Sequence, residues 1–162
     1  TSTGVEVTGN ISLTGSVQKQ ISTSTHTINF GAAGSSTQNY FLPFVQQAEQ
    51  AAPNNTHRMV VPYDGIIKKV IVHSKVAFGS SAAVRYHRID NGSASNFAND
   101  GSTDDVTTDV TRDMSTAYAA GVFNFTTGNT FSAGDQIALS FIRGNTALGD
   151  VVVTVVYEYE LF

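Results

Sequence analysis

Histidines are the first side chains in this sequence to consider for catalysis or metal binding. The four present, His26, His57, His73 and His87, are scattered, and none has a zinc-binding spacing such as His-Glu-x-x-His. The Gly-x-Ser-x-Gly spacing that presents a nucleophilic serine is also absent. His73 and His87 lie in strand-like segments among charged residues, so we expect both on exposed strand faces. The histidines therefore predict neither a catalytic site nor a metal site.

Two acidic groupings offer other chemistry. Glu158 and Glu160 lie two residues apart, and paired carboxylates hydrolyse glycosidic bonds when they face each other across a cleft. Neighbours on one strand face point the same way, so we expect these two to be solvated or to form ion pairs at a subunit interface. Residues 100–113 contain five aspartates whose oxygens suit calcium, but the EF-hand spacing is not met. We predict a solvated loop there, and no catalytic residue, metal or cofactor.

Composition narrows the class of protein. Of the 162 residues 41% are hydrophobic, which is enough to fill the core of one domain. Only 14% are charged, so we expect a surface of mostly neutral polar residues. A net charge of −4 argues against a nucleic-acid partner, which requires a clustered basic excess. There is no cysteine, so disulfides and thiolate metal sites are excluded. Neither a stretch of membrane-spanning length nor a basic-then-apolar leader is present, so no membrane partner is expected.

The elements that must position these residues are β-strands. From Arg58 onward the sequence alternates between apolar and polar residues, with turn signals such as Asn91-Gly92 between the segments. In residues 66–78 we expect Ile66, Val70 and Val72 on one face and Lys69 on the other. About eight strands and no long helix predict an all-β, antiparallel β-sandwich of the jelly-roll type with an N-terminal β arm.

The last strand-like segment, residues 151–162, has one face that is consistently apolar. Its other face is not consistently polar, because Val152 and Val156 interrupt Thr154, Glu158 and Glu160. An antiparallel strand with one solvated face alternates more cleanly than this. We therefore expect the second face to be covered in part, by the N-terminal arm or by another subunit.

A short repeat opens the chain. Val5-Glu6-Val7-Thr8-Gly9-Asn10 is followed in register by Ile11-Ser12-Leu13-Thr14-Gly15-Ser16, and Val17 begins a third copy. A lone ribbon of this length has no packing partner for its apolar row, so we expect neighbouring chains to cover it; an ordinary hairpin on a monomer is the alternative. The flexible stretch 31–37 divides an arm, residues 1–37, from a sandwich, residues 38–162. The predicted oligomer interface comprises Val5, Val7, Ile11, Leu13, Val17, Val152 and Val156.

Three stretches carry a family resemblance. Residues 59–72 read MVVPYDGIIKKVIV, residues 131–139 read FSAGDQIAL, and residues 7–15 read VTGNISLTG. The first two resemble the C-terminal β-sandwich modules of tailed-bacteriophage virion proteins, over roughly residues 57–160, and the third is similar to the shaft repeats of phage fibres. The resemblance implies a trimer on the outside of a virus particle, with no catalytic residues to carry over. With scarcely two shaft repeats, the chain fits a small head-decoration protein as well as a fibre tip.

These observations together predict a non-enzymatic virion protein. Its expected partners are further copies of itself, most simply in a homotrimer, and the major capsid or tail proteins of the particle. A carbohydrate-binding module that reads a host surface glycan is the alternative, with Tyr86, Tyr118 and Phe97 as candidate contact residues. The absence of tryptophan weakens that alternative.

Overall fold

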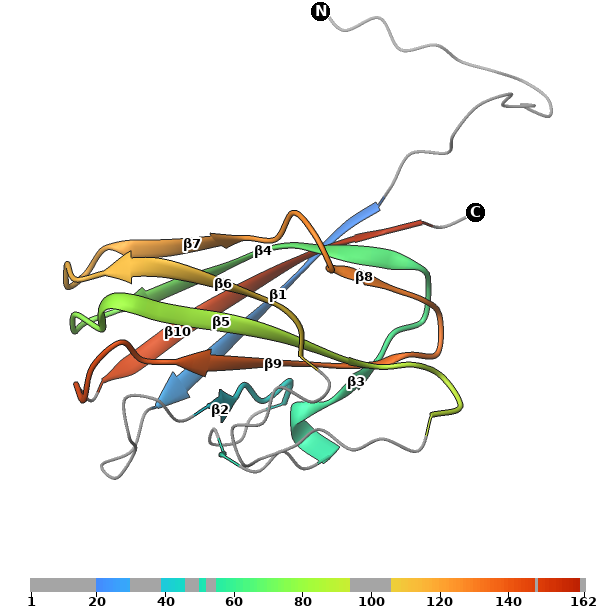
Figure 1. The fold of residues 1–162 in the computed structure, drawn as a ribbon, viewed down its shortest axis with the longest axis horizontal. Helices are drawn as coiled ribbons and strands as arrows, with labels where there is room; N and C mark the ends of the chain where they lie inside the picture. Colours follow the sequence, from blue (N-terminus) through green and yellow to red (C-terminus); the bar gives the residue numbers. More distant parts are fainter. Residues whose placement is uncertain are drawn as a thin grey trace, which may run out of the picture.

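The protein is an all-β sandwich. The computed structural model describes residues 20–29, 39–45, 50–51, 55–93, 106–147 and 149–160. Within them lie ten strands and one short 3-10 turn (Figure 1). The strands are β1 (Gln20–Asn29), β2 (Tyr40–Phe41), β3 (Met59–Val60), β4 (Gly65–Ser74), β5 (Gly79–Ile89), β6 (Val106–Met114), β7 (Ala120–Asn124), β8 (Thr130–Phe131), β9 (Gln136–Ile142) and β10 (Asp150–Tyr159), and the turn is Asn55–His57.

The strands form two antiparallel sheets. One has the order β1-β10-β4-β7, with β8 also paired to β4, and the other has the order β2-β9-β5-β6, with β3 also paired to β9. Figure 1 shows the two sheets as two layers, and the chain crosses between them repeatedly, for example from β4 to β5 and from β9 to β10. If each short pair, β2 with β3 and β7 with β8, counts as one strand, this is the eight-strand order of a jelly roll. The predicted fold class is confirmed.

The main core lies between the layers and follows the period of two residues seen in the sequence. Val70 and Val72 of β4 face inward beside Val153 and Val155 of β10, and all four are fully buried or nearly so. From the other sheet, Phe141 meets Phe123 edge-on, with ring centroids 6.3 Å apart. Alternation along a strand places one set of side chains in the core and the other set on the opposite face of the sheet.

Strand β9 is buried on both faces. Ile137, Leu139 and Phe141 point into the main core, as their alternation predicts. On the opposite face Ala138 belongs to a second apolar cluster with Phe41 and Ile89. The outer surface of this sheet is therefore shielded from solvent around β9 as well.

The two sequence motifs that resemble phage modules meet in space. Phe131 pairs with Gly65 across β8 and β4. The backbone N–H of Ala133 donates to Asp64 Oδ1 at 2.7 Å, and Gly134 donates to the carbonyl of Val61 at 2.8 Å. Gly134 has a φ of +90°, which favours glycine, and a Cβ there would lie 2.6 Å from Asn91 Nδ2. The two motifs thus contact each other through strand pairing and hydrogen bonds and connect the two sheets at one end of the sandwich.

A β-bulge in β4 overturns one predicted face. The register with β10 shifts between Val156, which is opposite Lys69, and Tyr157, which is opposite Ile67. Lys68 is the extra residue, so the alternation changes sides there. Ile67, rather than Ile66, joins the buried face, and the expectation that Ile66 shares a face with Val70 is wrong.

The last part of the predicted arm belongs to the sandwich. Residues 20–29 form β1, which pairs along its whole length with β10 of the same chain, from Gln20 opposite Tyr159 to Asn29 opposite Asp150. We expected the arm to pair with a neighbouring chain. The edge of β1 that faces β10 is instead occupied by a strand of the same chain. The arm does not cover the face of β10 here either, since β1 lies beside it in the sheet. The boundary at residue 37 falls outside the described residues.

Candidate assembly interface

The outer face of the β1-β10-β4-β7 sheet is the surface on which the predicted interface residues can be located. We define it as the side of this sheet that faces away from the second sheet. Because directly opposed residues of antiparallel strands share a face, the pairing register gives its composition row by row. The rows are Ile21–Glu158–Ile66, Thr23–Val156–Lys69–Asn124, Thr25–Thr154–Ile71–Val122 and Thr27–Val152–His73–Ala120.

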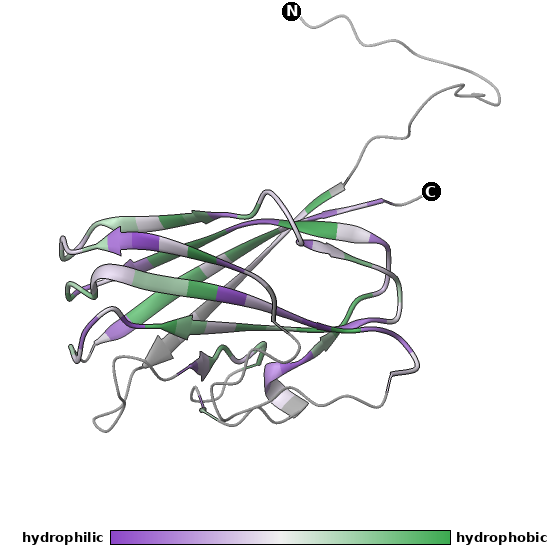
Figure 2. Cartoon of the chain, viewed as in Figure 1, coloured by the Kyte–Doolittle hydropathy of each residue, from purple (hydrophilic) through white to green (hydrophobic). Residues whose placement is uncertain are grey.

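This outer face is unusually apolar for a solvated sheet surface. Of seven large apolar side chains that are exposed in the described part of the chain, three lie on it: Ile21 at 65%, Val152 at 43% and Val122 at 38%. Half-buried Ile71 and Val156 lie between them. β10 and β4 are hydrophobic over much of their length (Figure 2). A contiguous apolar surface of this kind marks a contact site more often than an isolated exposed residue does.

Few charges interrupt the outer face. Lys69 is half-buried on it, and Glu158 at its margin forms an ion pair with Lys68, with Nζ and Oε2 3.4 Å apart. That pair lies within one chain, whereas we expected solvation or a partner in another subunit. The remaining two rows carry threonine and β-branched apolar side chains together with His73 and Ala120. Such a face binds by excluding water, at roughly 25 cal/mol per Å² of apolar area buried.

Two predicted interface residues lie on this outer face. Val152 is exposed and Val156 is half-buried, both beside β1 and β4. The other five, Val5, Val7, Ile11, Leu13 and Val17, lie outside the described residues. The sequence did not single out Ile21, Ile71 or Val122, because only the sheet register places them on the same face as Val152 and Val156.

His73 and His87 differ in burial and do not lie together. His73 is exposed, as predicted, but the prediction that His87 is exposed is wrong. His87 is 1% exposed, its Nε2 lies 2.7 Å from Ser140 Oγ, and its ring centroid is 4.8 Å from that of Phe41. Burial, and to a smaller extent the charge of Arg85, lowers the pKa of His87 to about 3. The serine of this pair is also fully buried, so a substrate has no access to it.

The described residues contain no group of three or more acidic or histidine side chains placed to hold a metal ion. Asp109 and Asp113 lie on β6, and the other three aspartates of residues 100–113 fall outside the described ranges. None of the helical structure described is long and apolar enough to span a membrane.

The three candidate sugar-binding aromatics are not brought together. Tyr86 is fully buried, and its hydroxyl donates to the carbonyl of Thr130 at 3.1 Å. Burial raises its pKa, chiefly through desolvation. Tyr118 is 70% exposed, and Phe97 lies outside the described residues. Tyr86 is therefore unavailable to a ligand.

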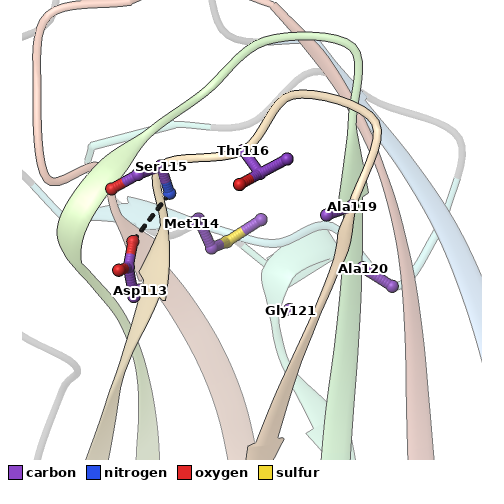
Figure 3. A pocket seen from close by; sticks show the side chains of 7 residues that line it. All are labelled: Asp113, Met114, Ser115, Thr116, Ala119, Ala120 and Gly121. Carbon is purple, nitrogen blue, oxygen red and sulfur yellow. Dashed lines mark hydrogen bonds between the residues drawn. The ribbon is translucent and has the colours of Figure 1, made fainter.

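A small pocket lies where β6 turns into β7, next to Tyr118 in the chain. Its volume is about 210 Å³, and Figure 3 shows the seven residues that line it, among them Met114 and Gly121. The N–H of Ser115 donates to Asp113 Oδ1 at 2.8 Å and fixes the start of the turn. The lining side chains are mostly small, so the pocket offers few functional groups to a ligand.

Comparisons with known proteins identify no family. No protein-family model and no curated protein sequence matches this chain. Among solved structures, a protein of Bacillus endospore appendages, described as disulfide-linked pili, is similar at a TM-score of 0.33 and 14% identity, over 95% of this chain and 100% of that chain. A protein of the virus-like particle of the extra small virus of the giant freshwater prawn Macrobrachium rosenbergii is similar at a TM-score of 0.29 and 11% identity, over 96% of this chain and 89% of that chain. Likeness this low carries no inference about what this chain does.

Proposed function

We propose that this chain is a non-enzymatic structural protein on the exterior of a tailed-phage particle, where it acts as a capsid-decoration or fibre-tip protein. Three copies associate through the outer face of the β1-β10-β4-β7 sheet. The observation that carries the proposal is the apolar surface formed there by Ile21, Val122 and Val152 together with Val156. The phage assignment draws on the resemblance of residues 59–72 and 131–139 to virion modules.

Association through this face is physically reasonable because it needs little rearrangement. The β-branched side chains of the outer face lose little rotamer freedom when a partner covers them. The chain offers few charges that must be desolvated there, so most of the buried area contributes favourably. An interface of this kind adds subunit contacts to a shell or holds a knob together at a fibre tip.

Native mass measurement of the full chain at micromolar concentration tests the proposal. We expect a three-chain species, and we expect Val152→Glu to weaken association by at least about tenfold because it places an unpaired charge in the contact. Thr127→Glu is the matched control, since it adds the same charge on the exposed turn between β7 and β8. A monomeric parent protein, or equal effects of the two substitutions, contradicts the proposal.

Carbohydrate binding is a second candidate because of Tyr118. Its ring is 70% exposed next to the pocket at the β6–β7 turn, and aromatic faces stack on sugar rings. A glycan array with the parent protein and Tyr118→Ala tests this function. Saturable binding to particular sugars that the substitution abolishes supports it, and an array without such binding refutes it.

A further inference from the structure

Strand β1 lies at the end of its sheet, with β10 as the only described strand that pairs with it. Its ten residues keep an uninterrupted register with β10. By contrast, the β10–β4 pair contains a bulge and the β5–β6 pair contains two irregularities. A long, regular edge strand is a template on which another strand can add through backbone hydrogen bonds.

The sequence of β1 lacks the residues with which proteins often block such addition. Gln20–Asn29 contains no proline, lysine, arginine, aspartate or glutamate, and five of its ten residues are threonine or isoleucine. These β-branched residues favour the extended conformation. Nothing in this sequence discourages a further strand from pairing with β1.

The other edges in the described part of the chain are short or protected. β6 ends the second sheet, but it carries Asp109, Arg112 and Asp113 and its register is irregular. Arg112 also donates from Nε to the carbonyl of Val122 at 2.9 Å, which occupies part of the edge of β7. β7 has five residues, and β2, β3 and β8 have two each. Among the edges in the described part of the chain, β1 is therefore the long, regular one whose sequence carries no charged residue or proline.

We propose that β1 accepts residues 5–13 of a neighbouring copy as an added strand on its side away from β10, and this inference rests on the proposed homotrimer. Pairing β1 with the β1 of a second copy closes after two chains, whereas a ring of three needs two different segments to meet. Among the segments outside the described residues, residues 5–13 carry the alternation of a strand, with Val5, Val7, Ile11 and Leu13 on one side. Residues 14–19 separate that strand from β1 and can span roughly 20 Å when extended, which is enough to reach a neighbour.

Cysteine cross-linking tests the inference without background, because the chain has no cysteine of its own. Thr25 is exposed in the middle of β1, so one protein carries Thr25→Cys. Nine others, each made longer by an affinity tag, carry a single cysteine at one position from 5 to 13. Opposed residues of adjacent strands lie within disulfide-forming distance. Each tagged protein is mixed with the Thr25→Cys protein, allowed to exchange subunits and oxidised.

The expected result is a mixed disulfide between tagged and untagged chains at alternate positions within residues 5–13, at least tenfold above the yield with Thr127→Cys, a control on the exposed β7–β8 turn. Double variants in one chain, oxidised at high dilution, measure the competing hairpin. A bond formed only within single chains overturns the inference, and so does the absence of mixed disulfides at all nine positions. If either occurs while the native mass remains that of three chains, the edge inference fails and the proposed assembly stands. A monomeric parent protein overturns both.

Discussion

His87 provides the sharpest test of how the second sheet is covered. The residue lies on β5 opposite Ala138 of β9, on the face of that sheet that points away from the main core. It is 1% exposed, lies within hydrogen-bond distance of Ser140 and contacts the ring of Phe41. Desolvation is the main reason for the lowering of its pKa, and the nearby Arg85 adds to it. Acidification should therefore destabilise this layer.

The size of the effect follows from the difference between the two states. In the unfolded chain the ring takes up a proton as the pH falls through 6.5, whereas in the folded protein it stays neutral down to about 3. The unfolded state binds more protons between these values, so the free energy of unfolding falls as the pH is lowered. Each pH unit in this interval is worth about 1.4 kcal/mol. Lowering the pH from 8 to 5 should thus remove roughly 2 kcal/mol.

Urea unfolding at pH 8, 7, 6 and 5, at one fixed protein concentration, measures this loss. His87→Gln is the matched variant, because glutamine keeps a hydrogen-bonding group near Ser140 but does not titrate. We expect the parent protein to lose about 2 kcal/mol more than the variant over this range. Parallel losses in the two proteins would refute the assignment of a buried neutral ring.

Three substitutions test other parts of the fold by urea unfolding. Asp135→Ala should cost about 2 kcal/mol, because the carboxylate accepts from the N–H groups of Asn91 at 2.9 Å and Ser132 at 2.8 Å; an equal cost for the exposed Asp150→Ala would contradict this. Gly65→Ala should cost about 3 kcal/mol or more, since its Cβ meets the carbonyl of Glu158 and the ring of Phe131, and a cost below about 1 kcal/mol argues against that close packing. Arg143→Ala should cost about 3 kcal/mol through loss of the 2.7 Å bond to the Ala147 carbonyl and the contact 5.5 Å above the Tyr40 ring; a neutral effect would show that this buried cation is dispensable.

Much of the fold was predictable from local alternation. Strand β10 shows why, because Val151, Val153 and Val155 repeat every second residue and all three are buried. The turn residues between segments gave the spacing of the strands, and the absence of long helical periodicity excluded other classes. The irregular face at Val152 and Val156 also drew attention to the outer face of the β1-β10-β4-β7 sheet, and its role as an interface stays a prediction.

Features that depend on distant chain segments were not predictable in this way. Tyr86 and His87 sit among charged neighbours in sequence, yet distant chain segments bury both side chains. The bulge at Lys68 leaves no signature in a pattern of apolar and polar letters, because either alternation is acceptable until β10 is in place. The residues opposite Val152, Thr27 on β1 and His73 on β4, are far from it in sequence, so only the sheet order reveals them.

The pairing of Gln20 with Tyr159 gives the molecule a direction. The polypeptide enters β1 and leaves β10 at one extremity of the sandwich, while the β6–β7 turn with Tyr118 lies at the opposite extremity, near Ser74 (Figure 1). If the protein is attached to a particle through the segment that precedes β1, the β6–β7 turn points away from that particle. Peptides fused before β1 or after β10 would then emerge together at the attached end of the sandwich. Insertions at the β6–β7 turn would be displayed at the opposite end.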